Sequence, residues 1–376
     1  MLEKLVAFPT VSSVSNLPLI DFAEEYLTSH GVACHRVYDE TGEKANLYAL
    51  IGPEVEGGVI LSGHTDVVPV EGQDWITDPF TVVEKDGKLY GRGTCDMKGF
   101  DALALALAPD MLAAGLKKPI QIALSYDEEV GCLGAPSMIA EMAETMPKAA
   151  GAIIGEPSMM KVVTGQKGSI GLRTEVRGFE VHSSMMQEGV SAVMVAARLV
   201  NWLRERTAEN IAAPIEGSPF QPPFTTLHVG VIQGGTAGNI TAKDCWFSTD
   251  MRVCPPEEPD DWLNRYLDFC REVEAEMKAI RPDAGIDVIV RMKNPPCRQE
   301  EAGGAEEIAR AVTGDNSVNV VSYGTEAGQF QDGGISACIC GPGDIAQAHQ
   351  PNEFITIEQF EAGEAFMRRL IERLSA

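Results

Sequence analysis

The sequence contains no pair of cysteines at C-x-x-C spacing, although it has nine cysteines among its 376 residues. An odd number of scattered cysteines argues against the disulfide framework of a secreted domain and against a cysteine-rich zinc knuckle. We therefore expect the thiols to be reduced and mostly buried.

Long apolar runs are also absent. No stretch reaches the roughly 18 consecutive apolar residues that a membrane-spanning helix needs, and the run at residues 102–108 ends at Pro109. The N-terminal residues lack the apolar region of a secretory signal peptide. These features predict a soluble, cytoplasmic protein with no membrane partner.

Basic residues are few, with 30 Lys and Arg against 55 Asp and Glu, and the net charge is −25. An acidic field repels phosphate, which argues against a nucleic-acid partner and is more compatible with a small cationic substrate. The same excess means that a single acidic residue is most often a solvated surface group. Because 44% of the residues are hydrophobic, a chain of this length can bury a sizeable core in two domains or one large one.

Apolar, strand-like runs alternate with helical stretches over the first 160 residues and again after about residue 292. This alternation predicts an α/β fold with helices on both faces of the sheet. Between these regions, half-exposed strand patterns accompany two long amphipathic helix patterns, which indicates a separate α+β domain. The predicted boundaries are residues 1–167 and 292–376 for a discontinuous first domain and residues 168–291 for the inserted domain.

Histidines and carboxylates follow five of the apolar runs, where the corresponding strands should end. Sheets of this class place their ligands at the carboxyl ends of strands. Any one of these residues could be a turn or surface residue, but their repeated placement is hard to obtain from a uniformly acidic surface. Histidine and carboxylate oxygen are the donors that borderline and hard divalent metals prefer, so the pattern predicts a metal site. The residues are His64, Asp66, Asp96, Glu128, Glu129, Glu156 and His349.

The segments "GHTDVVP", "GRGTCDMKG", "DEEVG", "GEP" and "AHQPNE" occur in this order along the chain. Together they resemble the metal and catalytic motifs of the M20 family of dinuclear zinc peptidases and deacylases, and the resemblance covers essentially the whole chain. It implies a zinc-peptidase-like catalytic α/β domain whose sheet is mixed, with an inserted lid and dimerisation domain. It also implies hydrolysis of linear amide bonds in N-acyl amino acids by a homodimer that uses two Zn²⁺ ions, with Co²⁺ as an alternative metal.

The resemblance further implies roles for the residues at the strand ends. Asp66 would orient His64, and Glu128 would be the general base that moves a proton from water to the leaving amine. Asp96 would bridge the two metal ions, and the peptide bond between Asp96 and Met97 would be cis. The five implied metal ligands are Asp96, His64 and Glu156 for one ion, and Asp96, Glu129 and His349 for the other.

The inserted domain would contribute three further residues. By the same resemblance, His182 would contact the oxyanion from the partner subunit, and Asn239 and Arg252 would bind substrate. The guanidinium of Arg252 suits the α-carboxylate of an amino acid. We also expect Glu326 to pair with a cationic group of the substrate, because a buried cation needs an anion nearby.

Other classes of function fit less well. The segment "GRGTCD" lacks the third glycine of the dinucleotide-binding fingerprint, and no G-x-S-x-G elbow of a serine hydrolase is present. A non-catalytic relative that only binds ligands should have lost Glu128 or a metal ligand, and none is lost. A related amidohydrolase with a different acyl group or amino acid remains the alternative within the enzyme class.

Overall fold

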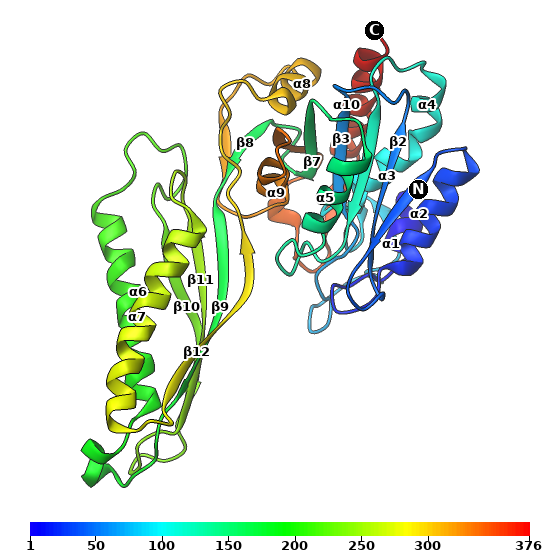
Figure 1. The fold of residues 1–376 in the computed structure, drawn as a ribbon. Helices are drawn as coiled ribbons and strands as arrows, with labels where there is room; N and C mark the ends of the chain where they lie inside the picture. The colour runs from blue at the N-terminus through cyan, green and yellow to red at the C-terminus, as the bar shows by residue number, and fades with distance from the viewer. The chain divides into compact units, whose positions relative to one another are not determined.

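The computed structural model describes residues 1–376, which form two compact units (Figure 1). The first contains the N- and C-terminal parts of the chain, and the second is formed mainly by the segment between them. The predicted boundaries lie within five residues of the observed ones, but the short segment 321–324 joins the second unit. Unit 1 comprises residues 1–165, 297–320 and 325–376, and unit 2 comprises residues 166–296 and 321–324.

Unit 1 is built on a mixed sheet of eight strands in the order β1-β2-β6-β3-β7-β14-β8-β13. Strand β3 is parallel to β6 and β7, β7 is parallel to β14, and β2 is antiparallel to β1 and β6. The parallel strands are buried on both faces, which explains their continuous apolar runs. The strands are β1 Cys34–Tyr38, β2 Ala45–Ile51, β3 Val59–His64, β6 Ile120–Ser125, β7 Gly151–Pro157, β8 Val163–Gln166, β13 Asn319–Val321 and β14 Ala337–Gly341.

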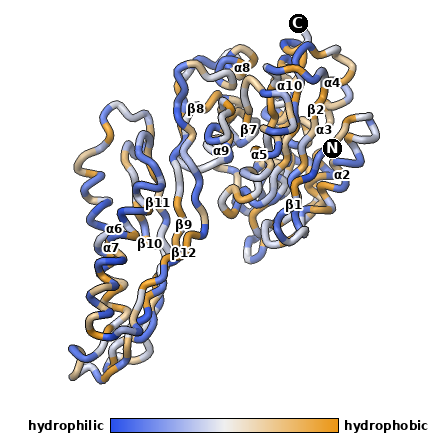
Figure 2. Tube along the Cα trace, in the orientation of Figure 1, coloured by the Kyte–Doolittle hydropathy of each residue, from blue (hydrophilic) through white to orange (hydrophobic).

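Helices cover both faces of this sheet, as the sequence predicts (Figure 1). The helices α5 (Ala135–Thr145) and α9 (Ala327–Asp332) contact each other on one side. The other helices share a single apolar core with the sheet, and hydrophobic residues occur along both helices and strands (Figure 2). They are α1 Leu2–Val6, α2 Leu17–Ser29, α3 Lys98–Ala106, α4 Ala108–Ala113, α8 Gly304–Thr313 and α10 Ile357–Ser375.

Two smaller elements of unit 1 lie near the functional residues. A three-stranded sheet has the order β15-β5-β4, and a short 3-10 helix, η2, precedes the loop that contains His349. These elements are β4 Val83–Lys85, β5 Lys88–Tyr90, β15 Phe354–Thr356 and η2 Ile345–Gln347.

Unit 2 is an antiparallel sheet of four strands in the order β10-β11-β9-β12, covered on one face by two long helices (Figure 1). Alternate residues of β11 are buried against these helices, and the others face away from them. Strand β10 is mostly exposed, whereas the sequence pattern predicts a half-exposed strand. The elements are β9 Gly168–Arg177, η1 Ser183–Glu188, α6 Ala192–Ala212, β10 Thr226–Gly234, β11 Asp244–Val253, α7 Pro259–Ile280 and β12 Gly285–Asn294.

The expectations about cysteines and membrane helices can be compared directly with the structure. All nine cysteines are free, and every one except the partly buried Cys34 is buried, which confirms the prediction of reduced, buried thiols. None of the helices combines the length and the apolar character that a bilayer span requires.

Candidate metal centre

The residues of the candidate centre lie at the edge of the unit 1 sheet where the parallel strands end. His64 is the last residue of β3, and Glu156 is the sixth of the seven residues of β7. Glu128 and Glu129 lie in the loop after β6, and His349 lies in the loop after β14. Asp96 precedes α3, and its peptide bond to Met97 is cis, as the resemblance implies.

The carboxylate of Asp96 lies between two imidazole rings. Its Oδ1 is 3.1 Å from Nε2 of His64, and its Oδ2 is 3.3 Å from Nε2 of His349. The same Nε2 of His349 is 2.9 Å from Oε2 of Glu129, and Nε2 of His64 is 3.7 Å from Oε1 of Glu156. Each half of the cluster therefore holds one histidine, one terminal carboxylate and one oxygen of Asp96.

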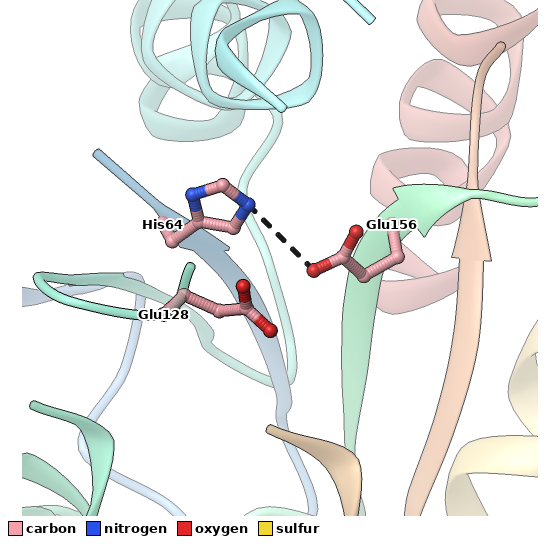
Figure 3. A group of neighbouring side chains, drawn as sticks. All are labelled: His64, Glu128 and Glu156. Carbon is pink, nitrogen blue, oxygen red and sulfur yellow. Dashed lines mark ion pairs between the residues drawn. The ribbon is translucent and has the colours of Figure 1, made fainter. Parts of the chain in front are cut away.

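Figure 3 shows how one half of the cluster is arranged. Glu128 and Glu156 extend their carboxylates toward the same space beside the ring of His64. Potential ligand atoms of His64, Glu128 and Glu156 lie within 4.8 Å of one another, and so do those of His64, Asp96 and Glu129. This spacing fits two neighbouring divalent ions bound by nitrogen and oxygen donors.

The electrostatics of the cluster also fit a bound cation. Burial, reinforced by the charge of Asp96, raises the pKa of Glu156 well above its usual value, and the same causes raise the pKa of Glu129 to about 7. Burial and repulsion by Glu129 also raise the pKa of Glu128, although the charge of His64 acts in the opposite direction. Several carboxylates thus share a site in which ionisation is costly without a positive charge.

The histidines show the complementary effect. Burial lowers the pKa of His64, but its hydrogen bond to Asp96 and the charges of Glu128 and Glu156 outweigh that effect and raise it. Hydrogen bonds to Asp96 and Glu129 raise the pKa of His349 to about 10. Metal ions would supply the positive charge that protonated imidazoles supply otherwise, so the donor set fits two divalent ions.

Asp66 has more contacts than the sequence predicts. The ring Nδ1 of His64 lies 2.9 Å from the backbone oxygen of Asp66 and 3.6 Å from its carboxylate, and these contacts fix the ring with Nε2 facing the cluster. The carboxylate also accepts hydrogen bonds from the backbone N–H groups of Glu128 at 3.1 Å and Glu129 at 3.3 Å. Asp66 therefore positions both the histidine and the loop that follows β6.

A chain of polar contacts, buried at Glu353 and Arg92 and exposed at its other end, connects Asp96 to His349. The Oε1 of Glu353 accepts hydrogen bonds from the backbone N–H groups of Cys95 and Asp96, and its Oε2 pairs with Arg92 at 2.7 Å. Arg92 also donates to the Oε1 of Gln73 at 2.6 Å, and the side-chain amide of Gln73 donates to the backbone oxygen of His349 at 2.9 Å.

Sequence reasoning did not identify Glu353, Arg92 or Gln73 as part of the site. Glu353 is the last residue of the segment "AHQPNE", and its place in the same segment as His349 was the only indication in the sequence that it belongs to the site. The structure shows that an acid four residues after a candidate ligand is buried rather than solvated.

Two further side chains, Cys132 and Glu326, lie close to residues of the candidate centre. The thiol of Cys132 donates a hydrogen bond of 3.2 Å to Oε1 of Glu128. Glu326 is 1% exposed and accepts hydrogen bonds from the hydroxyls of Ser62 and Ser125. These contacts hold Glu326 against β3 and β6. Its pairing with a cationic substrate group stays a prediction.

Within unit 2, two of the three expected site residues lie together. His182 forms an isolated bridge with Ile240, and the N–H of Ser183 donates to the backbone oxygen of Asn239. Arg252 lies near the opposite end of β11, where its Nε donates to Asp250 at 3.1 Å.

Residues 60–373 match the family model described as peptidase family M20/M25/M40. The chain belongs to this family. It is 37% identical over 383 residues to an acetylornithine deacetylase of Myxococcus xanthus, covering 98% of this chain and 95% of the relative. It is 32% identical over 380 residues to an acetylornithine deacetylase of Pasteurella multocida, covering 99% and 96%.

Solved structures of family members share the fold. A metallo-carboxypeptidase of the M20 family from Sulfolobus solfataricus matches with a TM-score of 0.77 at 17% identity, covering 100% of this chain and 98% of that chain. A dinuclear metal binding M20 peptidase from Bacillus subtilis matches with a TM-score of 0.61 at 13% identity, covering 99% and 95%. The chain is thus an M20 family hydrolase, with a His, Asp and Glu cluster that suggests a dinuclear metal site.

Proposed function

We propose that this M20 hydrolase removes the acetyl group from N2-acetyl-L-ornithine, giving ornithine and acetate in arginine biosynthesis. The observation that carries the chemistry is the position of Asp96, whose two oxygens face His64 and His349. The choice of substrate is supported by the similarity to two acetylornithine deacetylases, to which the chain is 37% and 32% identical over nearly its full length.

Two zinc ions are proposed as the resident metals, with Co²⁺ as an alternative. His64 and Glu156 would hold one ion, Glu129 and His349 the other, and Asp96 both. Bound there, the ions would polarise the acyl carbonyl and lower the pKa of a water molecule.

Glu128 is the proposed general base. Its carboxylate faces the same space as His64 and Glu156, which suits a group that takes a proton from water there and returns it to the leaving amine. The Cys132 thiol occupies Oε1, which leaves the other oxygen of Glu128 for the proton of the attacking water. The C–N bond of the amide breaks as water is consumed, so the acetyl carbon gains a hydroxyl group and the amine nitrogen gains a proton.

The proposed substrate-binding residues come from both units. Arg252 would hold the α-carboxylate by paired hydrogen bonds, and Glu326 would face the side-chain ammonium. Asp244, at the other end of β11, is eight residues from Arg252, which corresponds to about 27 Å of extended strand.

His182 and Asn239 lie beyond the Asp244 end of that strand. A small N-acyl amino acid cannot span this distance. We therefore propose that His182 acts on a substrate held by the partner subunit of a homodimer. The homodimer and the cytoplasmic location stay predictions.

The experiment is a panel of N-acetyl and N-succinyl amino acids, assayed for release of free amine with and without a chelator. We expect acetylornithine to give the highest kcat/KM, and we expect chelation to abolish turnover until Zn²⁺ or Co²⁺ is restored. Preference for succinyl-diaminopimelate would indicate a desuccinylase. Preference for neutral N-acyl amino acids would indicate another N-acyl-amino-acid deacylase. Turnover that survives chelation would refute the metal mechanism.

A further inference from the structure

Lys44 lies immediately before β2, and the candidate centre does not include it. Its ammonium lies 2.6 and 2.7 Å from the two carboxylate oxygens of Asp127, and 2.6 Å from the backbone oxygen of Ser12. The side chains of Lys44 and Asp127 are only 18% and 13% exposed. The three donors of an ammonium thus match three acceptors in a largely buried setting.

Asp127 directly precedes the proposed base, Glu128, and its backbone is in the left-handed region, with φ of 56°. A residue other than glycine is uncommon there and needs contacts that hold it. The bidentate contact with Lys44 is such a contact. The backbone oxygen of Asp127 also accepts a hydrogen bond from the N–H of Leu133, so this turn and the pair with Lys44 together hold the peptide that leads into Glu128.

Ser12 connects Lys44 to the other side of the same loop. Its backbone oxygen accepts from Lys44, and its hydroxyl donates to Oδ2 of Asp66 at 2.6 Å. Asp66 in turn accepts the backbone N–H groups of Glu128 and Glu129. The loop is thus held before Glu128 by Lys44 and at Glu128 itself by Asp66.

Lys44 also supplies the positive charge that this loop requires. Asp127, Glu128 and Glu129 are consecutive acids, and Asp66 contacts the same loop. Removing the ammonium would leave the partly buried Asp127 without a counter-ion beside two further carboxylates. The carboxylate would then turn toward solvent, and the backbone of the loop would move with it.

We propose that Lys44 is a positioning residue for Glu128, which it holds in place through the ion pair with Asp127. The inference rests on the proposed function for the identity of Glu128 as the base. It concerns geometry alone, since Lys44 contacts none of the proposed metal ligands.

The kinetic test compares Lys44→Met with Lys44→Arg and Asp127→Asn in the full-length protein. Misplacement of a base lowers turnover more than binding, so we expect kcat of Lys44→Met to fall about 10- to 100-fold while KM changes less than about twofold. Lys44→Arg keeps the charge and should recover most of the loss. In the Asp127→Asn background, Lys44→Met should lower kcat by less than about twofold, because the effects of two residues that act through one contact are not additive.

The matched control is Lys118→Met. Lys118 also donates to a backbone oxygen, that of Glu56 at 2.7 Å, but it lies before β6, away from the loop. We expect this variant to keep the kcat and KM of the unmodified protein. A Lys44→Met variant that does the same, or that loses activity in full additivity with Asp127→Asn, would overturn the proposal.

Hydrogen exchange of the peptide covering residues 126–132 tests the contact without turnover. We expect exchange to be at least about tenfold faster in Lys44→Met, but not in Lys118→Met. Unchanged exchange would overturn the positioning role even if activity fell. If the unmodified protein does not hydrolyse acetylornithine, the proposed function fails, whereas the exchange result still decides whether Lys44 holds the loop. If Lys44→Met does not fold, Lys44→Arg and Asp127→Asn are compared in the same way, and normal exchange in Asp127→Asn overturns the proposal.

Discussion

The carboxylate of Glu353 accepts a hydrogen bond of 3.1 Å from the backbone N–H of Asp96. The proposed bridging residue is thus oriented through its main chain as well as its side chain. Glu353 is held in turn by Arg92, and both side chains are 1% exposed. Such outer contacts set the direction of metal ligands and influence metal affinity.

Replacing Glu353 by Gln should weaken metal binding about 10- to 100-fold, as measured by competition with a chromogenic chelator. The variant keeps an acceptor for the N–H of Asp96 but leaves the buried charge of Arg92 without an opposite charge, which should also cost about 3–5 kcal/mol of unfolding free energy. Glu364→Gln is the control, since Glu364 pairs with Arg368 on the exposed face of α10. Equal metal affinities for the two variants would contradict this role of Glu353.

Replacing Glu128 by Gln should lower kcat about 10²- to 10⁴-fold, because the amide cannot accept the proton of the attacking water. The variant should still bind two metal ions, as measured by metal analysis after dialysis. Glu129→Gln is the comparison, and we expect it to lose metal as well as activity. Full turnover by Glu128→Gln would refute the assignment of the base.

Mixing two inactive variants tests whether His182 acts across subunits. If it does, a heterodimer of His182→Ala and Glu128→Gln has one complete site, so an equal mixture that exchanges subunits should recover about one quarter of normal activity. The assay follows acetylornithine hydrolysis over time after mixing. A mixture that stays inactive although native mass spectrometry detects the heterodimer would place His182 and Glu128 of one subunit in the same site.

Glu326 should make the stability of the metal-free protein depend on pH. Burial raises the pKa of Glu326 from its usual 4.5 to about 7, although the hydrogen bond from Ser125 opposes the shift. The folded protein thus holds this proton more tightly than the unfolded chain does. The tighter binding of this proton stabilises the folded state in full below pH 4.5. This stabilisation, about 3 kcal/mol of unfolding free energy, is lost as the pH rises from 4.5 to 7.

Urea unfolding at pH 4.5 and 7.5 in the presence of a chelator measures this effect. Glu326→Gln cannot lose the proton, so its stability relative to the unmodified protein should rise between the two pH values. Glu25→Gln, at an exposed position of α2, should show no such change. A constant difference for Glu326→Gln would contradict the raised pKa.

The order of elements was largely predictable from the sequence. The buried parallel strands carry continuous apolar runs, as in β7. The helix pattern at residues 100–115 is broken into α3 and α4, with Pro109 in the first turn of α4, where its missing N–H does no harm. Charged residues interrupt the apolar pattern of β12, so this strand is hard to predict from the sequence.

The candidate centre was predictable where its residues lie at or just after the ends of strands, because the carboxyl ends of parallel strands meet at one edge. His64, Glu129 and Glu156 are examples. Lys44 and Arg92 were not predictable, since a basic residue in a loop resembles any solvated charge. Their roles depend on long-range partners, such as Asp127 for Lys44 and Glu353 for Arg92, which no local pattern specifies.

The position of β14 in the unit 1 sheet has a consequence for the newly made chain. This strand lies between β7 and β8, yet it is synthesised after the whole of residues 166–296. At ribosomal rates of about 5–20 residues per second, β14 is synthesised roughly ten seconds or more after β7. Unit 2 has its own apolar core and can fold during that interval. His349 is made later still, so the nascent polypeptide lacks one of the proposed metal ligands until that residue has been added.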